Sequence, residues 1–164
     1  MAPVRAGTSH TRLNRRPVFA GSRTHTLPAA LATSTAATRS ADYELLVFDG
    51  RIPDEHVEAY CAIPAMGAVL HTLNIRLAAE QISFIANHAE DEVVIVDGSL
   101  TEQLAAVLPE LPMVHTVIVT GNGNLAGLAE SGKSVVRYDD FIAGQPTDFD
   151  WPERSLGRRA ALRC

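Results

Sequence analysis

Two short runs of apolar residues constrain the fold of this chain more than any other feature. Residues 92–97 read EVVIVD and residues 114–121 read VHTVIVTG, and both are rich in valine and isoleucine. A strand with one solvated face alternates apolar and polar side chains, whereas a strand buried on both faces does not. Both runs therefore predict strands inside a sheet that is covered on both faces.

Helical patterns separate the strand candidates. Residues 56–67 predict a short helix that closes at a proline and a glycine, and residues 78–89 repeat apolar side chains with helical spacing. A third helix is expected to begin at a capping box formed by Ser99 and Glu102 and to close at Pro109.

Residues 68–75 and 134–138 predict two further strands, and Asp139 or Asp140 is expected to cap a last helical turn. The alternation of strands and helices predicts an α/β fold, a partial parallel sheet with flanking helices and right-handed crossovers. These four strand candidates would make a narrow sheet with unpaired edges. We therefore expect the layer to be part of a larger domain, with edges through which it could associate.

The chain divides into segments of unlike charge. Residues 1–40 contain six arginines and no acidic residue, residues 41–152 contain 4 basic and 18 acidic residues (a net charge of −14), and residues 153–164 carry +3. We expect a disordered or non-native leader at 1–40, an irregular lead-in at 41–54, one partial domain at 55–152 and a disordered tail at 153–164.

This distribution also limits the function classes. The basic residues form no single face for nucleic acid, and the apolar runs are far shorter than the roughly 20 residues that span a bilayer. The leader has a composition typical of transit peptides, so a cytoplasmic location is only the default expectation. Two cysteines, Cys61 and Cys164, indicate neither a disulfide framework nor a thiolate metal site.

The segment GLAESGKS, residues 127–134, fits the phosphate-loop pattern G-x-x-x-x-G-K-[ST]. Such a loop needs a strand that runs directly into its first glycine and a helix that begins at its Lys-Ser pair. The preceding strand candidate ends at Gly121, and Ser134 begins another strand candidate. We therefore interpret this stretch as a short helical turn stopped by Gly132.

No catalytic constellation is evident elsewhere. Asp97 could hold Mg²⁺ at a strand end, but an Asp-Gly-Ser turn explains it more simply. The six histidines show no metal-ligand spacing, and His71 and His115 are expected to be satisfied core or edge residues. Ser99 and Ser131 lack the G-x-S-x-G elbow of serine hydrolases.

The remaining polar patterns are weak. The pairs Asp91-Glu92 and Asp139-Asp140 are interpreted as solvated caps and turns rather than as acid/base pairs. The segment TGNGNLAG contains G-x-G after a strand, but its third glycine comes one residue late for a dinucleotide site.

One part of the chain, about residues 55–152, resembles a known family. It contains HVEAYCAIPAMGAVLHTLNIRL, EQISFIANHAEDEVVIVD and VVRYDDFIAGQPTDFDWP. These segments resemble the large N-terminal α/β domain of acyl-CoA synthetases in the adenylate-forming (AMP-binding) superfamily, and are closest to long-chain fatty-acid–CoA ligases. The most specific parts are the run from Gly67 to Leu77 and the block from Asn87 to Asp91.

The resemblance implies a two-step ligation in the intact family. A fatty acid attacks ATP with Mg²⁺ to give an acyl-adenylate and pyrophosphate, and coenzyme A then displaces AMP. The family's Ser/Thr/Gly-rich ATP loop would follow Pro152, yet this sequence contains neither that loop nor the family's C-terminal lysine. We therefore expect a fragment that is inactive alone and binds none of these cofactors. Asn74 and Arg76 match the family and are expected to maintain the fold.

Accordingly, no catalytic, cofactor-binding or metal-binding residue is assigned from the sequence. Likeness is lost on both sides into Arg/Ala/Ser-rich sequence, as a frameshift or a gene remnant would produce. Two alternatives stay open: a non-enzymatic α/β interaction module that binds a partner through open sheet edges, and, less favoured, a phosphate-loop nucleotide triphosphatase.

Overall fold

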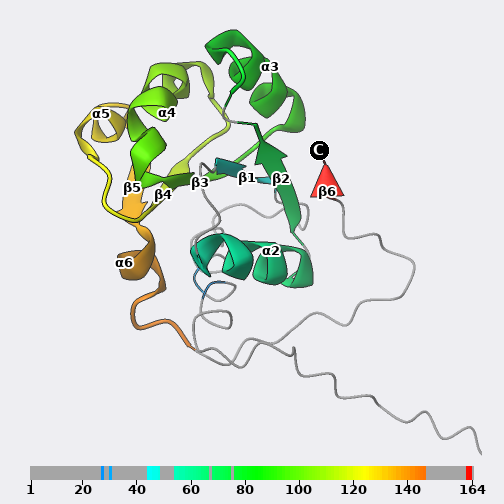
Figure 1. Ribbon diagram of the computed structural model, residues 1–164, viewed down its shortest axis with the longest axis vertical. Coiled ribbons are helices and arrows are strands. Elements are labelled where there is room, and N and C mark those ends of the chain that lie inside the picture. The colour runs from blue at the N-terminus through cyan, green and yellow to red at the C-terminus, as the bar shows by residue number, and fades with distance from the viewer. Residues whose placement is uncertain are drawn as a thin grey trace, which may run out of the picture.

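A computed structural model describes Leu27, Ala30 and residues 44–48, 54–66, 68–74, 76–146 and 162–163. The expected fold class is confirmed: strands and helices alternate around a parallel sheet (Figure 1). None of the described helices has the length and apolar character needed to cross a bilayer. Most of the leader and of the tail lies outside the described residues.

All pairings in the sheet are parallel, and the strand order is β5-β4-β3-β1-β2-β6. The strands are β1 (Glu44–Phe48), β2 (Val69–Leu73), β3 (Val93–Asp97), β4 (Thr116–Thr120), β5 (Ser134–Arg137) and β6 (Leu162–Arg163). The two apolar runs that predicted buried strands form β3 and β4. Their central position explains why both faces of each are apolar.

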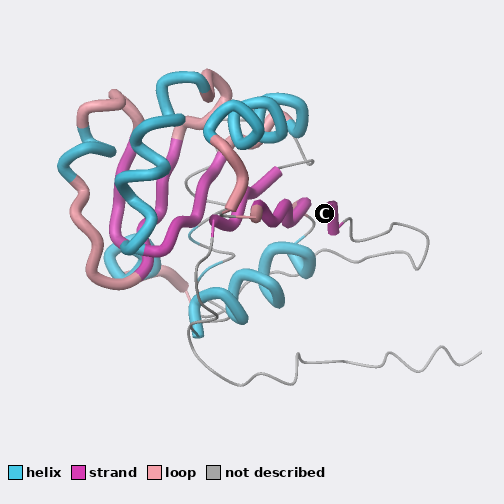
Figure 2. Tube along the Cα trace, turned by 45° about the horizontal axis from the view of Figure 1, so that its top comes forward, coloured by secondary structure: helices cyan, strands magenta, loops and turns pink. Residues whose placement is uncertain are grey.

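The helices are α2 (Asp54–Met66), α3 (Ala79–Ala89), α4 (Thr101–Val107), α5 (Ala126–Ala129) and α6 (Tyr138–Ile142). Short 3₁₀ turns precede and follow α4 at Gly98–Leu100 and Leu108–Glu110. Figure 2 shows helices on both sides of the strands. The chain moves from β1 to β2 in one direction and from β2 to β3 in the other, so right-handed crossovers place α2 and α3 on opposite faces.

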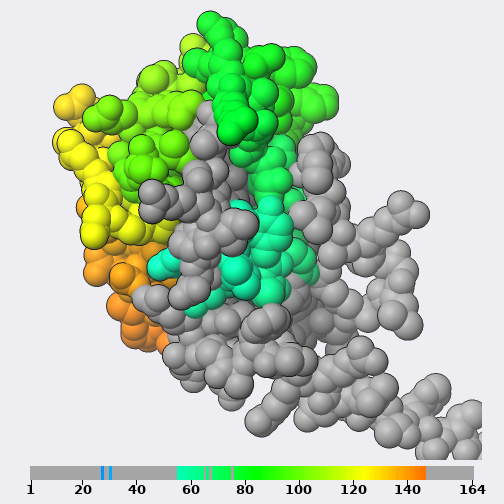
Figure 3. Space-filling view, in the orientation of Figure 1, coloured from blue at the N-terminus to red at the C-terminus, as the bar shows by residue number. Residues whose placement is uncertain are grey.

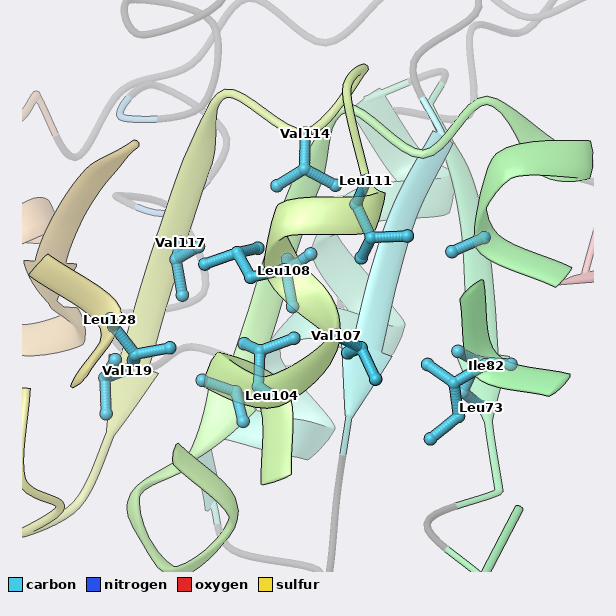
Figure 4. Close-up of a cluster of buried hydrophobic side chains, with 13 residues drawn as sticks. Leu73, Ile82, Leu104, Val107, Leu108, Leu111, Val114, Val117, Val119 and Leu128 are labelled. Atoms are coloured by element: carbon cyan, nitrogen blue, oxygen red, sulfur yellow. The ribbon is translucent and has the colours of Figure 1, made fainter. Parts of the chain in front are cut away.

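Two hydrophobic clusters fill the spaces between the layers. The first contains Ala59, Ala62 and Ile63 of α2 with alternate strand residues, and the second packs α3, α4 and α5 against the other face (Figure 4). Alternation is regular, because Val93 and Ile95 lie in the first cluster and Val94 and Val96 in the second. In the space-filling view, α3 lies at the top of the visible face and α2 below it (Figure 3).

The structure corrects the expected irregular lead-in at 41–54. Residues 44–48 form β1, which pairs with β2 and β3 in the middle of the sheet, and Asp54 begins α2. The segment E-L-L-V-F-D-G at 44–50 repeats the pattern of E-V-V-I-V-D-G at 92–98, so a signal for this strand was available in the sequence.

Both expected side-chain caps are also wrong. The capping box at Ser99 does not form, because α4 follows a 3₁₀ turn whose N-cap is Asp97, and the N-cap position of α4 has no side-chain hydrogen bond. Helix α6 begins after Arg137, also without a side-chain cap, so neither Asp139 nor Asp140 caps it.

The expectations for the two ends are corrected in part. Leu27 and Ala30 are helical and buried in the first cluster, and Leu162–Arg163 form β6 beside β2. These residues therefore belong to the fold, although the sequence assigned them to a disordered leader and a disordered tail.

Candidate functional site

Ligands of open parallel sheets bind outside the carboxyl ends of the strands, where the strand order reverses. In the order β2-β1-β3-β4-β5 the reversal occurs between β1 and β3. The described residues at this edge of the sheet are Asn74 after β2, Asp97 at the end of β3, the loop that follows Thr120, and Arg137 at the end of β5.

At the end of β3, Asp97 closes a local turn. Its Oδ1 accepts hydrogen bonds from the backbone N–H of Ser99 at 2.8 Å and from the Ser99 hydroxyl at 2.5 Å. The interpretation of this segment as an Asp-Gly-Ser turn is confirmed. The Ser99 hydroxyl and Asp97 Oδ1 therefore bond to each other and hold the turn.

The loops after β3 and β4 contact each other through glycines. A Cβ on Gly98 would lie 2.3 Å from the backbone nitrogen of Gly123, which no side chain tolerates. Arg137 donates to the carbonyl oxygens of Gly121 at 2.6 Å and Gly123 at 2.5 Å. The G-x-G segment therefore serves close packing of the two loops, and the cation next to it is bound to backbone oxygens.

The GLAESGKS segment does not have the geometry of a phosphate loop. Gly127 lies within the four-residue helix α5, Gly132 has φ +73° at the end of the following turn, and Ser134 begins β5. The Lys133 ammonium donates to the carbonyl oxygen of Leu111 at 2.9 Å. The expected short helical turn is confirmed, but its C-cap is Glu130, and Gly132 lies two residues further along the chain.

A buried histidine–aspartate contact joins β2 to the α3–β3 connection. Nδ1 of His71 lies 3.1 and 3.0 Å from the two carboxylate oxygens of Asp91, and the residues are 4% and 1% exposed. Burial raises the pKa of the Asp91 carboxyl, while the hydrogen bond and the charge of His71 act to lower it. His71 is a satisfied core histidine as expected, but the interpretation of Asp91 as a solvated turn residue is wrong.

The position of Asp91 follows from how α3 ends. Glu90 adopts a left-handed conformation (φ 59°), and the N–H of Asp91 donates to the carbonyl oxygen of Ala86 at 3.1 Å. This C-terminal motif changes the direction of the chain at the end of α3, and the Asp91 carboxylate then contacts His71. The contact joins residues twenty positions apart, so no local pattern in the sequence indicates it.

A cavity of about 510 Å³ opens at the carboxyl end of β2. Its lining is partly polar and partly apolar: His71, Thr72, Leu73, Asn74, Leu77 and Ile85. The Asn74 side chain accepts a hydrogen bond from the N–H of Arg76 at 3.0 Å and so holds the turn after β2. This agrees with a fold-maintaining role for Asn74. The described residues of the lining include no lysine or arginine to hold a phosphate.

Metal ligation is likewise not supported by the part of the chain that the structure describes. No three His, Cys, Asp or Glu side chains in that part converge on one point. His115, which precedes β4, lies 3.7 Å from Glu92 through Nε2 and 2.8 Å from the Thr116 hydroxyl through Nδ1.

Comparison with known proteins gives the family. A model of the AMP-binding enzyme family matches residues 47–153. The long-chain-fatty-acid–CoA ligase of Thermus thermophilus is 48% identical over 100 residues, which cover 61% of this chain and 17% of that protein. The medium-chain-fatty-acid–CoA ligase of Ectopseudomonas oleovorans is 34% identical over 107 residues, which cover 65% and 19%.

Solved structures agree with the fold. The adenylation domain of a carboxylate reductase from Mycobacterium chelonae superposes with a TM-score of 0.68 at 16% identity, covering 86% of this chain and 24% of that one. An anthranilate–CoA ligase in complex with anthranoyl-AMP gives 0.65 at 19% identity, covering 80% and 24%. At these identities the likeness concerns the fold alone.

The chain spans less than a fifth of the length of the fatty-acid–CoA ligases that it matches. The matched segment 47–153 contains the last two residues of β1, strands β2 to β5 and helices α2 to α6. Because this segment makes up more than half of the chain, the chain belongs to the AMP-binding enzyme family.

Proposed function

We propose that residues 47–153 are a scaffold segment of a carboxylate–CoA ligase, and that they do not carry out the ligation by themselves. The observation that supports this proposal is the extent of the family match, which covers strands β2 to β5 and helices α2 to α6. The relatives that match are CoA ligases for fatty acids and for other carboxylates. A fatty acid is the favoured substrate class, because the highest identity among these relatives is to a long-chain ligase.

In such a ligase a carboxylate, ATP and coenzyme A give an acyl-CoA by way of an acyl-adenylate. The groups that hold ATP and Mg²⁺ would come from residues other than the described ones, because the Lys133 ammonium and the Asp97 carboxylate are engaged in local structure. The role of this segment is then to present the carboxyl edge of its sheet as a rigid base for the rest of the enzyme. A cytoplasmic location goes with this proposal.

Segment exchange tests the proposal. Residues 47–153 would replace the matched region of the Thermus thermophilus ligase, and formation of palmitoyl-CoA from palmitate, ATP and coenzyme A would be measured. We expect a folded chimera with activity within about tenfold of the parent, a loss of about 1.4 kcal/mol or less in transition-state stabilisation. The same chimera with Lys133→Ala should be equally active, since this lysine holds only a backbone carbonyl.

A folded chimera without measurable activity would contradict the scaffold role. A second measurement addresses the isolated chain: ATP–pyrophosphate exchange in the presence of palmitate and Mg²⁺ is expected to stay at the level of the protein-free blank. Exchange above the blank would show that the isolated chain forms an acyl-adenylate and would overturn the proposal. Hydrolysis of ATP to ADP and phosphate that disappears with Lys133→Ala would instead support a phosphate-loop enzyme.

A further inference from the structure

The outermost strand on the β2 side of the sheet comes from outside the family segment. The family match ends at residue 153, whereas β6 consists of Leu162–Arg163. This strand pairs in parallel with β2, with Leu70 opposite Leu162 and His71 opposite Arg163. A piece of chain with no counterpart in the family match therefore covers one edge of the family's sheet.

An uncovered edge of β2 would present unpaired backbone N–H and C=O groups, and such edges recruit strands from other chains. The edge lies next to His71, whose side chain is buried and bonded to Asp91. Burial of β2 is high on its second and third residues, since Leu70 and His71 are 0% and 4% exposed. These are the two residues that pair with β6.

The charge distribution also favours the tail, residues 153–164, as the segment that lies beside β2. Residues 41–152 have 4 basic and 18 acidic residues, a net of −14, whereas residues 153–164 have four arginines and one glutamate, a net of +3. Opposite net charge raises the local concentration of the tail near the acidic domain, and this attraction acts within about 10 Å at moderate salt. A parallel strand also needs a long return connection, and the chain from the end of β5 to β6 provides it.

We propose that the outer edge of β2 is a strand-docking site and that its occupant is this chain's own carboxyl-terminal segment, which caps the edge against association with a second copy. The inference does not depend on the proposed function. It concerns how a segment of a ligase fold is kept from pairing with copies of itself, whatever the segment contributes to catalysis.

Hydrogen exchange on two shortened chains tests the cap. One chain ends at Ala161 and lacks β6, and its matched control ends at Arg163 and lacks only Cys164, which removes thiol effects from the comparison. In the chain ending at Ala161 we expect the β2 amides that face β6 to exchange about tenfold faster or more than in the control, because their strand partners are gone. Amides of β4, which pairs with β3 and β5, should stay within about twofold.

Size-exclusion chromatography with light scattering completes the test. The control is expected to elute at one mass, and the chain ending at Ala161 at a higher, concentration-dependent mass, because the open edge pairs with a second copy. Equal exchange at β2 in the two chains would overturn the proposal. Equal acceleration at β2 and β4 would also overturn it, since that result means loss of global stability rather than opening of one edge.

Discussion

Replacing His71 by leucine tests what holds β2 in the fold. The change keeps an apolar side chain and removes the imidazole, whose Nδ1 lies 3.1 and 3.0 Å from the Asp91 oxygens. Asp91 is 1% exposed, so water cannot take the place of the lost partner. Removing one member of a buried pair costs about 3–5 kcal/mol, and we expect His71→Leu to lower the free energy of unfolding at pH 7 by that amount.

The size of this effect comes from leaving the Asp91 carboxylate buried without its partner, and not from the stabilisation that the contact itself provides. Total stability of a domain is about 5–15 kcal/mol, so the single replacement would remove a large part of it. If the cause is the unpaired carboxylate, then adding Asp91→Val should recover at least about 1 kcal/mol relative to the sum of the two single changes.

The dependence on pH has a definite sign. Burial raises the pKa of Asp91 above its ordinary value of 3.8, and the contacts with His71 partly oppose this rise. Without His71 the pKa rises further. A carboxyl whose pKa is higher in the folded state than in the unfolded state favours folding below the ordinary value, and this contribution is lost as pH rises through the folded-state pKa. The deficit of His71→Leu should therefore shrink as pH falls from neutral toward the ordinary value.

Urea unfolding followed by far-ultraviolet circular dichroism measures these quantities for the parent, the two single variants and the double variant. His88→Leu is the matched control, because His88 is exposed on α3, and its effect should stay within about 0.5 kcal/mol. The reasoning fails if His71→Leu costs less than about 1 kcal/mol at neutral pH, or if its deficit grows on acidification.

Three further predictions concern the loops. Gly98→Ala should lower the free energy of unfolding in urea by about 3 kcal/mol or more, because the new Cβ would lie 2.3 Å from the Gly123 nitrogen. Gly121 has φ +64° and open space around it, so Gly121→Ala should lower it by only about 1 kcal/mol. Equal losses for the two variants would refute the packing argument. Glu90→Gly should raise stability by about 0.5–1 kcal/mol, since φ is 59° there; a lower melting temperature would contradict it. Isothermal titration of ATP into the parent and into Lys133→Ala should give no binding heat in either, and saturable heat lost in the variant would restore the phosphate loop.

The elements that the sequence predicted correctly carry local signals. In β3 and β4 the signal is an unbroken β-branched run, and in α3 it is helical spacing of apolar residues that ends where Ala89 meets the left-handed Glu90. Rejecting a phosphate loop at GLAESGKS also needed only local information, namely the element before Gly127 and the element after Lys133. Such predictions succeed because the deciding residues lie within a few positions of one another.

The missed strand β1 shows a different limit. Its segment repeats the acid, four apolar residues, Asp-Gly pattern of β3. The strands that pair with it, β2 and β3, come from later parts of the chain. The caps were missed for a physical reason. An acid or serine near a helix start can bond to several backbone donors, and here Asp97 binds Ser99 two residues earlier than the expected box.

Asp91 and Glu92 show why a candidate site cannot be found from neighbouring letters alone. The two acids are adjacent, yet Asp91 is buried against His71 while Glu92 is half-buried and lies 3.7 Å from His115. What separates them is the turn at Glu90, which directs one carboxylate under α3 and leaves the next at the start of β3. The environment of Asp91 is thus set by how α3 ends, and β2 supplies its partner, His71.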